Sequence, residues 1–217
     1  TESSTGARSQ RWQVPHWELL GVMLLLIGLY LVRQPGYLSG SLLRVVDDVL
    51  ILLIAVLAMT AARVSRTTLV AHVGLGVVAT GVAIVAEVTS TSDLERIATA
   101  VSAYVLVASA IAILRTLLRQ SSVSPDTVFG GLTVYLAVGI VFAMTYTALA
   151  RSDPAQFQPP QLVLLSDASM YYFSFVTLTT LGYGDIVPIS PVAKMLAVTE
   201  AIIGQLYIAV LVARLVG

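Results

Sequence analysis

Six long apolar stretches, separated by short polar segments, dominate the pattern of this sequence. Each supplies roughly the 20 residues that a helix needs to cross a bilayer. Strict alternation of apolar and polar positions is absent, which argues against a membrane barrel, and backbone groups in hydrocarbon have to be satisfied within a helix. The predicted membrane-spanning helices cover residues 17–32, 42–61, 67–88, 94–118, 125–150 and 191–216.

A seventh, shorter helix is predicted between the last two spans. Ser166 or Asp167 can cap a helix that runs to about Leu178, which is too short to cross a bilayer. Such a helix fits a re-entrant segment that is buried among neighbouring protein. Its carboxyl end carries partial negative charge, which favours a cation held at mid-membrane.

The polar linker at residues 120–126 is the best candidate for a domain boundary. Ser124 can cap the following helix, with Pro125 at its first position, where a missing N–H costs nothing. We therefore divide the chain into an N-terminal segment (residues 1–16), a four-helix unit (17–119) and a unit made of helix, re-entrant loop and helix (120–217). The proline-containing stretch at 151–161 is interpreted as an extracellular turret.

Composition supports a membrane protein and excludes several functional classes. Hydrophobic residues make up 57% of the chain and charged residues only 11%, whereas soluble domains have about a quarter charged residues. The formal net charge is zero and no basic patch is present, so nucleic-acid binding has no support. Without cysteine there is no disulfide or thiolate metal site. We find no nucleophile–base set, phosphate-binding loop or metal-ligand cluster, and therefore expect no enzyme.

Basic residues near the spans predict the orientation of the chain. With six spans, seven arginines fall on the side of both termini and five basic residues fall on the other side. The positive-inside rule then predicts that both termini are cytoplasmic. The alternative is that the first apolar stretch is a cleaved signal peptide. That alternative would leave five spans and an extracellular N-terminus, which fits the charges less well.

The most distinctive stretch is Thr179-Thr180-Leu181-Gly182-Tyr183-Gly184-Asp185, just before the last span. Gly182 and Gly184 can adopt positive φ, which would allow successive carbonyls to point the same way. A row of carbonyls facing one axis replaces the water shell of a dehydrated cation. The alternative without function is a tight glycine-containing turn between two helices.

Residues 180–185 resemble the signature of potassium channels, with Leu181 where that family usually has valine. Residues 171–179 resemble the pore helix that precedes the signature. The resemblance implies an all-α membrane fold, in which a four-helix sensor-like bundle precedes a pore unit, and a homotetramer. It implies K⁺ sites formed by Thr180, Leu181, Gly182 and Tyr183, with Gly184 completing the selectivity filter. It further implies Asp185 at the outer mouth, and no cofactor other than the K⁺ ions.

The pore helix departs from the usual pattern of that family at its centre. Tyr172 and Phe173 stand where many relatives have two tryptophans, and Thr177 and Thr179 complete the predicted support of the filter. Phe173 has neither N–H nor O–H, so it cannot donate the hydrogen bond that holds Asp185 in some relatives. We therefore expect a less rigid filter. Leu181 changes the packing behind the filter but leaves its carbonyl in place.

The last helix carries several candidate functional residues. Gly204 lies 19 positions after Asp185, where the family commonly has a hinge glycine, although close helix packing is an alternative role. Glu200 is an intramembrane carboxylate that either modulates the ion pathway or has a hydrogen-bonded structural role. Candidate residues for the cavity and inner constriction are Gln205, Ile208, Val212 and Val216.

In voltage-gated relatives the fourth helix carries regularly spaced basic residues, but residues 98–113 contain none here. We therefore predict weak or absent intrinsic voltage gating. Asp47 and Asp48 in the second helix either pair with Arg44 near the interface or form a modulatory cation or ligand site. His72 is interpreted as a packed residue rather than a proton sensor.

The resulting hypothesis is a multi-pass potassium channel of the plasma membrane that conducts K⁺ passively. One alternative is a poorly selective monovalent cation channel on the same fold. Another is a transporter or membrane scaffold, which should show inverted repeats and broken helices in both halves. Membrane lipid is the expected environment. We expect an unidentified partner or ligand to gate the protein, because the sequence does not indicate the gating stimulus.

Overall fold

The computed structural model describes residues 16–32, 40–62, 64–89, 91–119, 124–158 and 166–216. The predicted segment 1–16, the linker at 120–123 and part of the predicted turret lie outside these residues, apart from His16. The helices are α1 (His16–Val32), α2 (Gly40–Ala61), α3 (Arg66–Thr89), α4 (Ser92–Arg119), α5 (Pro125–Ser152), α6 (Asp167–Leu178) and α7 (Pro191–Val216). A short 3-10 turn, η1 (Pro154–Gln156), follows α5.

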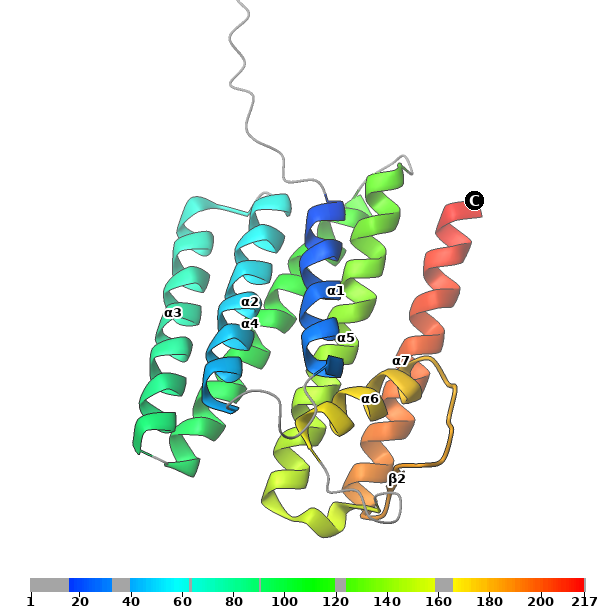
Figure 1. Ribbon diagram of the computed structural model, residues 1–217. Coiled ribbons are helices and arrows are strands. Elements are labelled where there is room, and N and C mark those ends of the chain that lie inside the picture. Colours follow the sequence, from blue (N-terminus) through cyan, green and yellow to red (C-terminus); the bar gives the residue numbers. More distant parts are fainter. Residues whose placement is uncertain are drawn as a thin grey trace, which may run out of the picture.

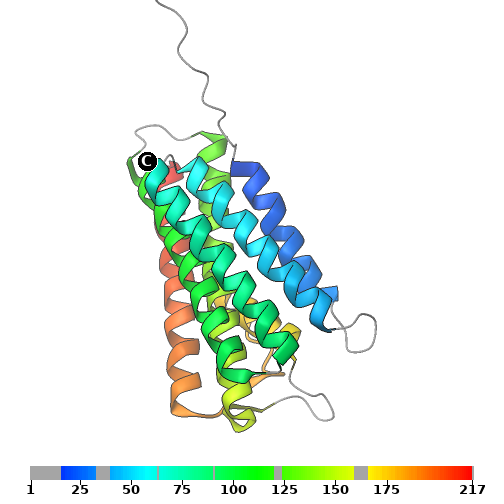
Figure 2. The same cartoon turned by 90° about the vertical axis from the view of Figure 1, so that its left-hand side faces the viewer.

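The long helices run along one common direction, and α5 lies at the centre of the arrangement (Figure 1). It packs against α1 and α4 of the first four helices and against α6 and α7. The view turned by 90° shows the same lengthwise packing of α1 to α4 (Figure 2). The start of α1 and the end of α7 lie at the same end of the molecule (Figure 1). Helix α6 is short, and the segment after it returns along α7 (Figure 1).

The chain is a mostly helical membrane protein. Among the described residues, four helices are long and apolar enough to cross a membrane, with spans Arg66–Ala86, Asp93–Arg119, Pro125–Ser152 and Pro191–Arg214. These correspond to four of the six predicted spans. The described apolar stretches of α1 and α2 are shorter, namely Trp17–Gly28 and Asp48–Ala61.

Capping residues set the start of the two helices on either side of the predicted turret. The Ser124 side chain accepts a hydrogen bond from the Thr127 N–H, and Pro125 occupies the first turn of α5, as predicted. The Ser166 side chain accepts in the same way from the Ser169 N–H, so Ser166 rather than Asp167 is the N-cap of α6. In both caps the side chain of the third helical residue, Thr127 or Ser169, accepts a hydrogen bond from the backbone N–H of the capping serine.

Two hydrophobic clusters hold α6 in place. One joins it to the first helices through Tyr171, which packs with residues such as Met23, Ile54 and Ile140. The other lies between α5, α6 and α7 and contains Tyr146, Phe157, Met170, Phe173, Ile186 and Ala193. Burial of such side chains contributes roughly 1.5–3 kcal/mol each, so α6 is anchored on both sides.

A two-residue strand pair closes the loop around α6, and the sequence analysis did not anticipate it. Strand β1 (Phe157–Gln158) pairs antiparallel with β2 (Val187–Pro188), with Phe157 opposite Pro188. The Ile189 N–H adds a hydrogen bond of 2.8 Å to the Gln156 carbonyl. This pair ties the segment after α5 to the segment that precedes α7.

Candidate functional site

The segment that follows α6 has an alternating backbone conformation. Thr180, Gly182 and Gly184 have φ of 57°, 58° and 77°, and the residues between them, Leu181 and Tyr183, do not have positive φ. Such alternation turns successive carbonyls toward the same side, which is the arrangement that coordinates a dehydrated cation. The predicted conformations of Gly182 and Gly184 are confirmed. Positive φ at Thr180 was not predicted, because it is uncommon for a residue other than glycine.

The start of this segment is attached to the carboxyl end of α6 by backbone hydrogen bonds. The Thr180 N–H donates to the Thr177 carbonyl at 2.9 Å, and the Leu181 N–H donates to the Val176 carbonyl at 2.9 Å. Thr179 is the C-cap residue, and its hydroxyl donates back to the Phe175 carbonyl. The end of α6, with its partial negative charge, therefore leads directly into the row of carbonyls.

Two side chains from the long helices support the same region. The Gln205 amide of α7 donates to the Thr180 hydroxyl at 3.1 Å. The Tyr135 hydroxyl of α5 donates to the Leu178 carbonyl at 3.2 Å, which satisfies one of the free carbonyls at the end of α6. Gln205 thus lies beside the segment.

The other end of the segment is held by Tyr172. A hydrogen bond between its hydroxyl and the Asp185 carboxylate raises the pKa of Tyr172 from its usual value of 10.0 to about 12. The Asp185 carboxylate also accepts from the Ile186 N–H at 3.0 Å. The sequence analysis expected that Phe173 cannot hold Asp185. In the structure the adjacent Tyr172 provides a bond to Asp185 instead.

Phe173 packs in an aromatic cluster rather than facing Asp185. Its ring lies 5.0 Å from that of Tyr146 and 5.5 Å from that of Phe157, both nearly edge-on. Tyr146 and Phe157 also contact each other edge-on at 5.7 Å. Edge-to-face contacts of this kind are favourable beyond their buried area. The cluster gives α6 an apolar support.

Glu200 is fully buried behind α6, with 0% of its surface exposed. The Tyr146 hydroxyl of α5 donates to its Oε2 atom at 2.7 Å. The Ser174 hydroxyl of α6 lies 2.5 Å from its Oε1 atom. This carboxyl group therefore joins α5, α6 and α7.

Gly204 is the point of closest approach between α7 and the end of α6. A Cβ atom at this position would lie 2.4 Å from the Leu178 carbonyl oxygen. No side chain fits at that distance without a backbone shift. The close packing that the sequence analysis considered for Gly204 is therefore present.

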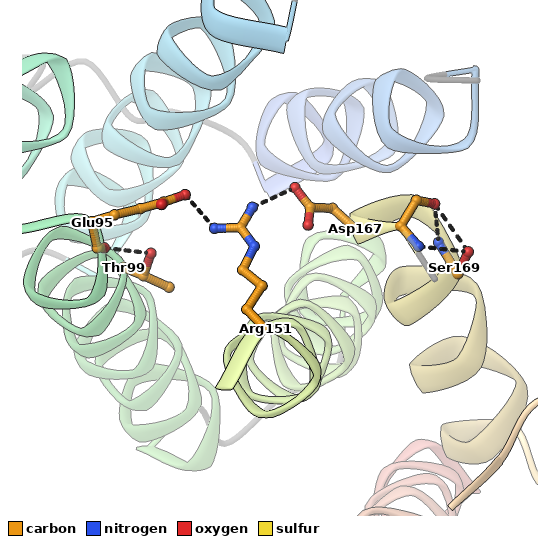
Figure 3. Close-up of polar contacts among 6 residues, drawn as sticks. Glu95, Thr99, Arg151, Asp167 and Ser169 are labelled. Atoms are coloured by element: carbon orange, nitrogen blue, oxygen red, sulfur yellow. Dashed lines mark hydrogen bonds and ion pairs between the residues drawn. The ribbon is translucent and has the colours of Figure 1, made fainter. Parts of the chain in front are cut away.

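Arg151, near the end of α5, links two other elements (Figure 3). Its guanidinium group forms ion pairs with Glu95 of α4 and with Asp167 at the start of α6, the latter at 2.7 Å. Figure 3 shows the guanidinium between the two carboxylates. The sequence analysis did not identify this link, because the three residues are far apart along the chain. It connects the first four helices with α6.

The predicted cavity residues lie on a largely exposed face of the chain. Leu181 and Tyr183 are 55% and 67% exposed, and Ile208 and Val212 of α7 are 38% and 51% exposed. Val216 lies at the exposed end of the same helix. A single chain thus leaves many apolar side chains of α7 exposed. Surfaces of this kind mark interfaces with protein or membrane.

The candidate residues of the first four helices are Asp47 and Asp48 of α2 and His72 of α3. Asp48 is half-buried in α2, and the side chain of Asp47 lies outside the described residues. His72 bonds to the Thr68 carbonyl of its own helix and stacks on Tyr104. The described residues contain no group of three or more metal-ligating side chains.

The C-terminal part of the chain is similar to known proteins. Residues 130–217 match a family model described as "Ion channel". This range covers most of α5 together with α6, the filter-like segment and α7. The matched family is one of channels rather than of enzymes. No solved structure matches the chain significantly.

Several curated proteins are similar to part of the chain. Protein LctB of Bacillus caldotenax is 38% identical over 89 residues, which cover 38% of this chain and 64% of that protein. The two pore potassium channel c of Oryza sativa subsp. japonica is 36% identical over 86 residues, covering 40% of this chain and 17% of that protein. The voltage-gated potassium channel Kch of Escherichia coli is 35% identical over 92 residues, covering 42% and 20%. The chain spans less than two thirds of the length of each.

Proposed function

We propose that four copies of this chain form a potassium-selective channel that conducts K⁺ passively across the plasma membrane. The observation that carries the proposal is the alternating φ at Thr180, Gly182 and Gly184. A stack of carbonyls on one side of the segment is the chemistry that replaces the hydration shell of K⁺. The family match over this region and the similarity to potassium channels support the same conclusion.

In this proposal each residue of the segment has a defined role. The carbonyls of Thr180, Leu181, Gly182 and Tyr183, with the Thr180 hydroxyl, form successive K⁺ sites. Gly184 allows the chain to turn at the outer end, and Asp185 adds negative charge at the outer mouth. Thr177, Thr179, Tyr172 and Phe173 support the filter through the contacts described above.

The tetramer follows from one filter segment per chain. A potassium filter is a ring of four such segments around one axis, so four identical chains with cyclic symmetry are required. The exposed apolar residues of α7 support this assembly, because neighbouring chains would cover part of them. Ile208, Val212 and Val216 would then line the inner cavity and constriction, where an apolar ring gates by dewetting.

The first four helices form a sensor-like unit without sensor charges. In α4, Arg96 lies near the start and Arg115 and Arg119 lie near the end, with no basic residue between 97 and 114. Six spans, both termini in the cytoplasm and the filter at the outer face complete the proposed topology. The shared end of α1 and α7 supports an even number of spans (Figure 1).

Flux into liposomes tests this function. Purified chain is reconstituted into vesicles loaded with K⁺, and uptake of a K⁺ tracer is compared with uptake of a Na⁺ tracer. We expect K⁺ uptake that barium blocks and little Na⁺ uptake. Gly182→Ala should abolish the K⁺ preference, because alanine is strained at this positive φ. The control Gly74→Ala has open space around its Cβ and should behave as wild type. Equal uptake of both ions by the wild type would favour the poorly selective channel and refute the proposal.

A further inference from the structure

The buried Glu200 carboxyl group belongs to a chain of three short oxygen–oxygen contacts. The first joins the Tyr146 hydroxyl to Glu200 Oε2 at 2.7 Å. The second joins the Ser174 hydroxyl to Glu200 Oε1 at 2.5 Å. The third joins the same Ser174 hydroxyl to the Gly139 carbonyl at 2.7 Å. Each contact is within hydrogen-bond range, and all three are fully satisfied when each has its own proton between the two oxygens.

The donors in this chain can be counted. Tyr146 and Ser174 each bring one O–H, and the Gly139 carbonyl brings none. An ionised carboxylate is also an acceptor only, which would leave two protons for three contacts. A protonated carboxyl group provides the third proton. It then donates from Oε1 to Ser174, Ser174 donates to the Gly139 carbonyl, and Tyr146 donates to Oε2.

Among the residues that the structure describes, no ion pair stabilises an anionic Glu200. The groups that face it are Tyr146 and Tyr135 of α5 and Ser174 of α6. The ion pairs of Arg96 and Arg151 are formed with Asp93, Glu95 and Asp167 rather than with Glu200. Burial of an unpaired ionised carboxylate is very unfavourable, whereas a neutral, hydrogen-bonded acid is not.

We propose that Glu200 is held as a neutral, protonated acid, and that its hydrogen bonds position α6 and hence the filter segment. The inference rests on the proposed function for its consequence in ion selection, but the protonation of Glu200 does not depend on it. Glu200 touches neither the ions nor the carbonyls that would bind them. It is a positioning residue, which acts through Ser174 on the helix whose carboxyl end leads into Thr180.

Infrared difference spectroscopy tests the protonation. The full chain in lipid at neutral pH is compared with Glu200→Gln. We expect the carbonyl band of a protonated carboxylic acid in the wild type and its loss in the variant. As a control, Asp153→Asn removes an exposed carboxylate and should change carboxylate bands only. A wild-type minus E200Q spectrum that contains carboxylate bands only would overturn the proposal.

Ion selection tests the positioning role. Glutamine can donate to Ser174 and accept from Tyr146 without charge, so E200Q should keep the ratio of K⁺ to Na⁺ uptake within about twofold of wild type. E200A leaves buried partners unsatisfied and should lower the ratio about tenfold. If E200A does not assemble, Ser174→Ala removes the contacts of Ser174 with Glu200 and with the Gly139 carbonyl, and should lower the ratio as well. Wild-type ratios in both E200A and S174A, or loss of the ratio in E200Q, would refute the role. Absence of K⁺ flux through the wild type would refute the proposed channel function. The infrared spectra would then still test whether Glu200 is protonated.

Discussion

The Gln205 amide of α7 donates a hydrogen bond to the Thr180 hydroxyl at 3.1 Å. This contact joins the inner helix to the first residue of the proposed filter, which also has an unusual positive φ. The two residues are separated by 25 positions, and the packing of α7 against the end of α6 brings them together. Rotation of α7 at this level would therefore act directly on the innermost proposed K⁺ site.

Replacing Gln205 with leucine should weaken that site. The substitution removes the donor to Thr180, and a hydrogen bond of this kind contributes about 0.5–1.5 kcal/mol. Converted to a ratio, this free energy corresponds to roughly two- to tenfold. We expect single-channel K⁺ conductance in planar bilayers to fall by that factor. The control Thr199→Val removes a hydroxyl that bonds only to its own helix and should leave conductance unchanged. Equal conductance of Q205L and wild type would show that the contact has no role in conduction.

Gly204→Ala should destabilise the protein. The new methyl group would overlap the Leu178 carbonyl oxygen, and overpacking at a close backbone contact costs about 1–3 kcal/mol. We expect a lower midpoint of heat denaturation in detergent and fewer tetramers in cross-linking. Gly81→Ala, which has open space around it, is the matched control and should change the midpoint little. If G204A retained the wild-type midpoint while its gating changed, Gly204 would be a hinge and not a packing contact.

Arg151→Gln should loosen the connection between α4 and α6. Arg151 forms two partly exposed ion pairs, and such pairs contribute about 0.2–1 kcal/mol each. We expect a lower denaturation midpoint at low salt and a smaller difference from wild type in concentrated salt, where charges are screened. Arg96→Gln breaks an exposed pair within one helix and serves as the control. If the denaturation midpoint of R151Q were lowered equally at low and high salt, the stabilisation would come from packing of the arginine side chain and not from its ion pairs.

Currents through the reconstituted channel should depend only weakly on voltage. Each elementary charge that crosses the field contributes about 2.3 kcal/mol per 100 mV, and the centre of α4 has no basic residue to move. We expect open probability to change gradually between negative and positive voltages in planar bilayers. Steep voltage-dependent opening would contradict this interpretation of α4 and require a sensor elsewhere.

Local features of the fold could be predicted from the sequence. The starts of α5 and α6 follow from serine caps, and the conformations of Gly182 and Gly184 follow from the freedom of glycine at positive φ. Apolar runs predicted the long helices, because six stretches of about 20 apolar residues permit few other structures in a membrane.

Long-range contacts could not be predicted in the same way. Tyr146 and Glu200 are 54 positions apart, and Arg151 and Glu95 are 56 apart. Their pairing depends on how α5 packs against α4, α6 and α7, which no local pattern encodes. The bond between Tyr172 and Asp185 was missed for a related reason. Phe173 occupies the position from which relatives donate, whereas in this chain the hydroxyl of the neighbouring Tyr172 bonds to the Asp185 carboxylate.

The central claim is that the segment from Thr180 to Gly184 selects K⁺. Its most direct test is the reversal potential of the reconstituted wild type in a planar bilayer, with KCl on one side and an equal concentration of NaCl on the other. A potassium-selective filter predicts a reversal potential far from zero, with the KCl side negative. In Gly182→Ala the reversal potential should lie near zero. A reversal potential near zero in the wild type would contradict the account.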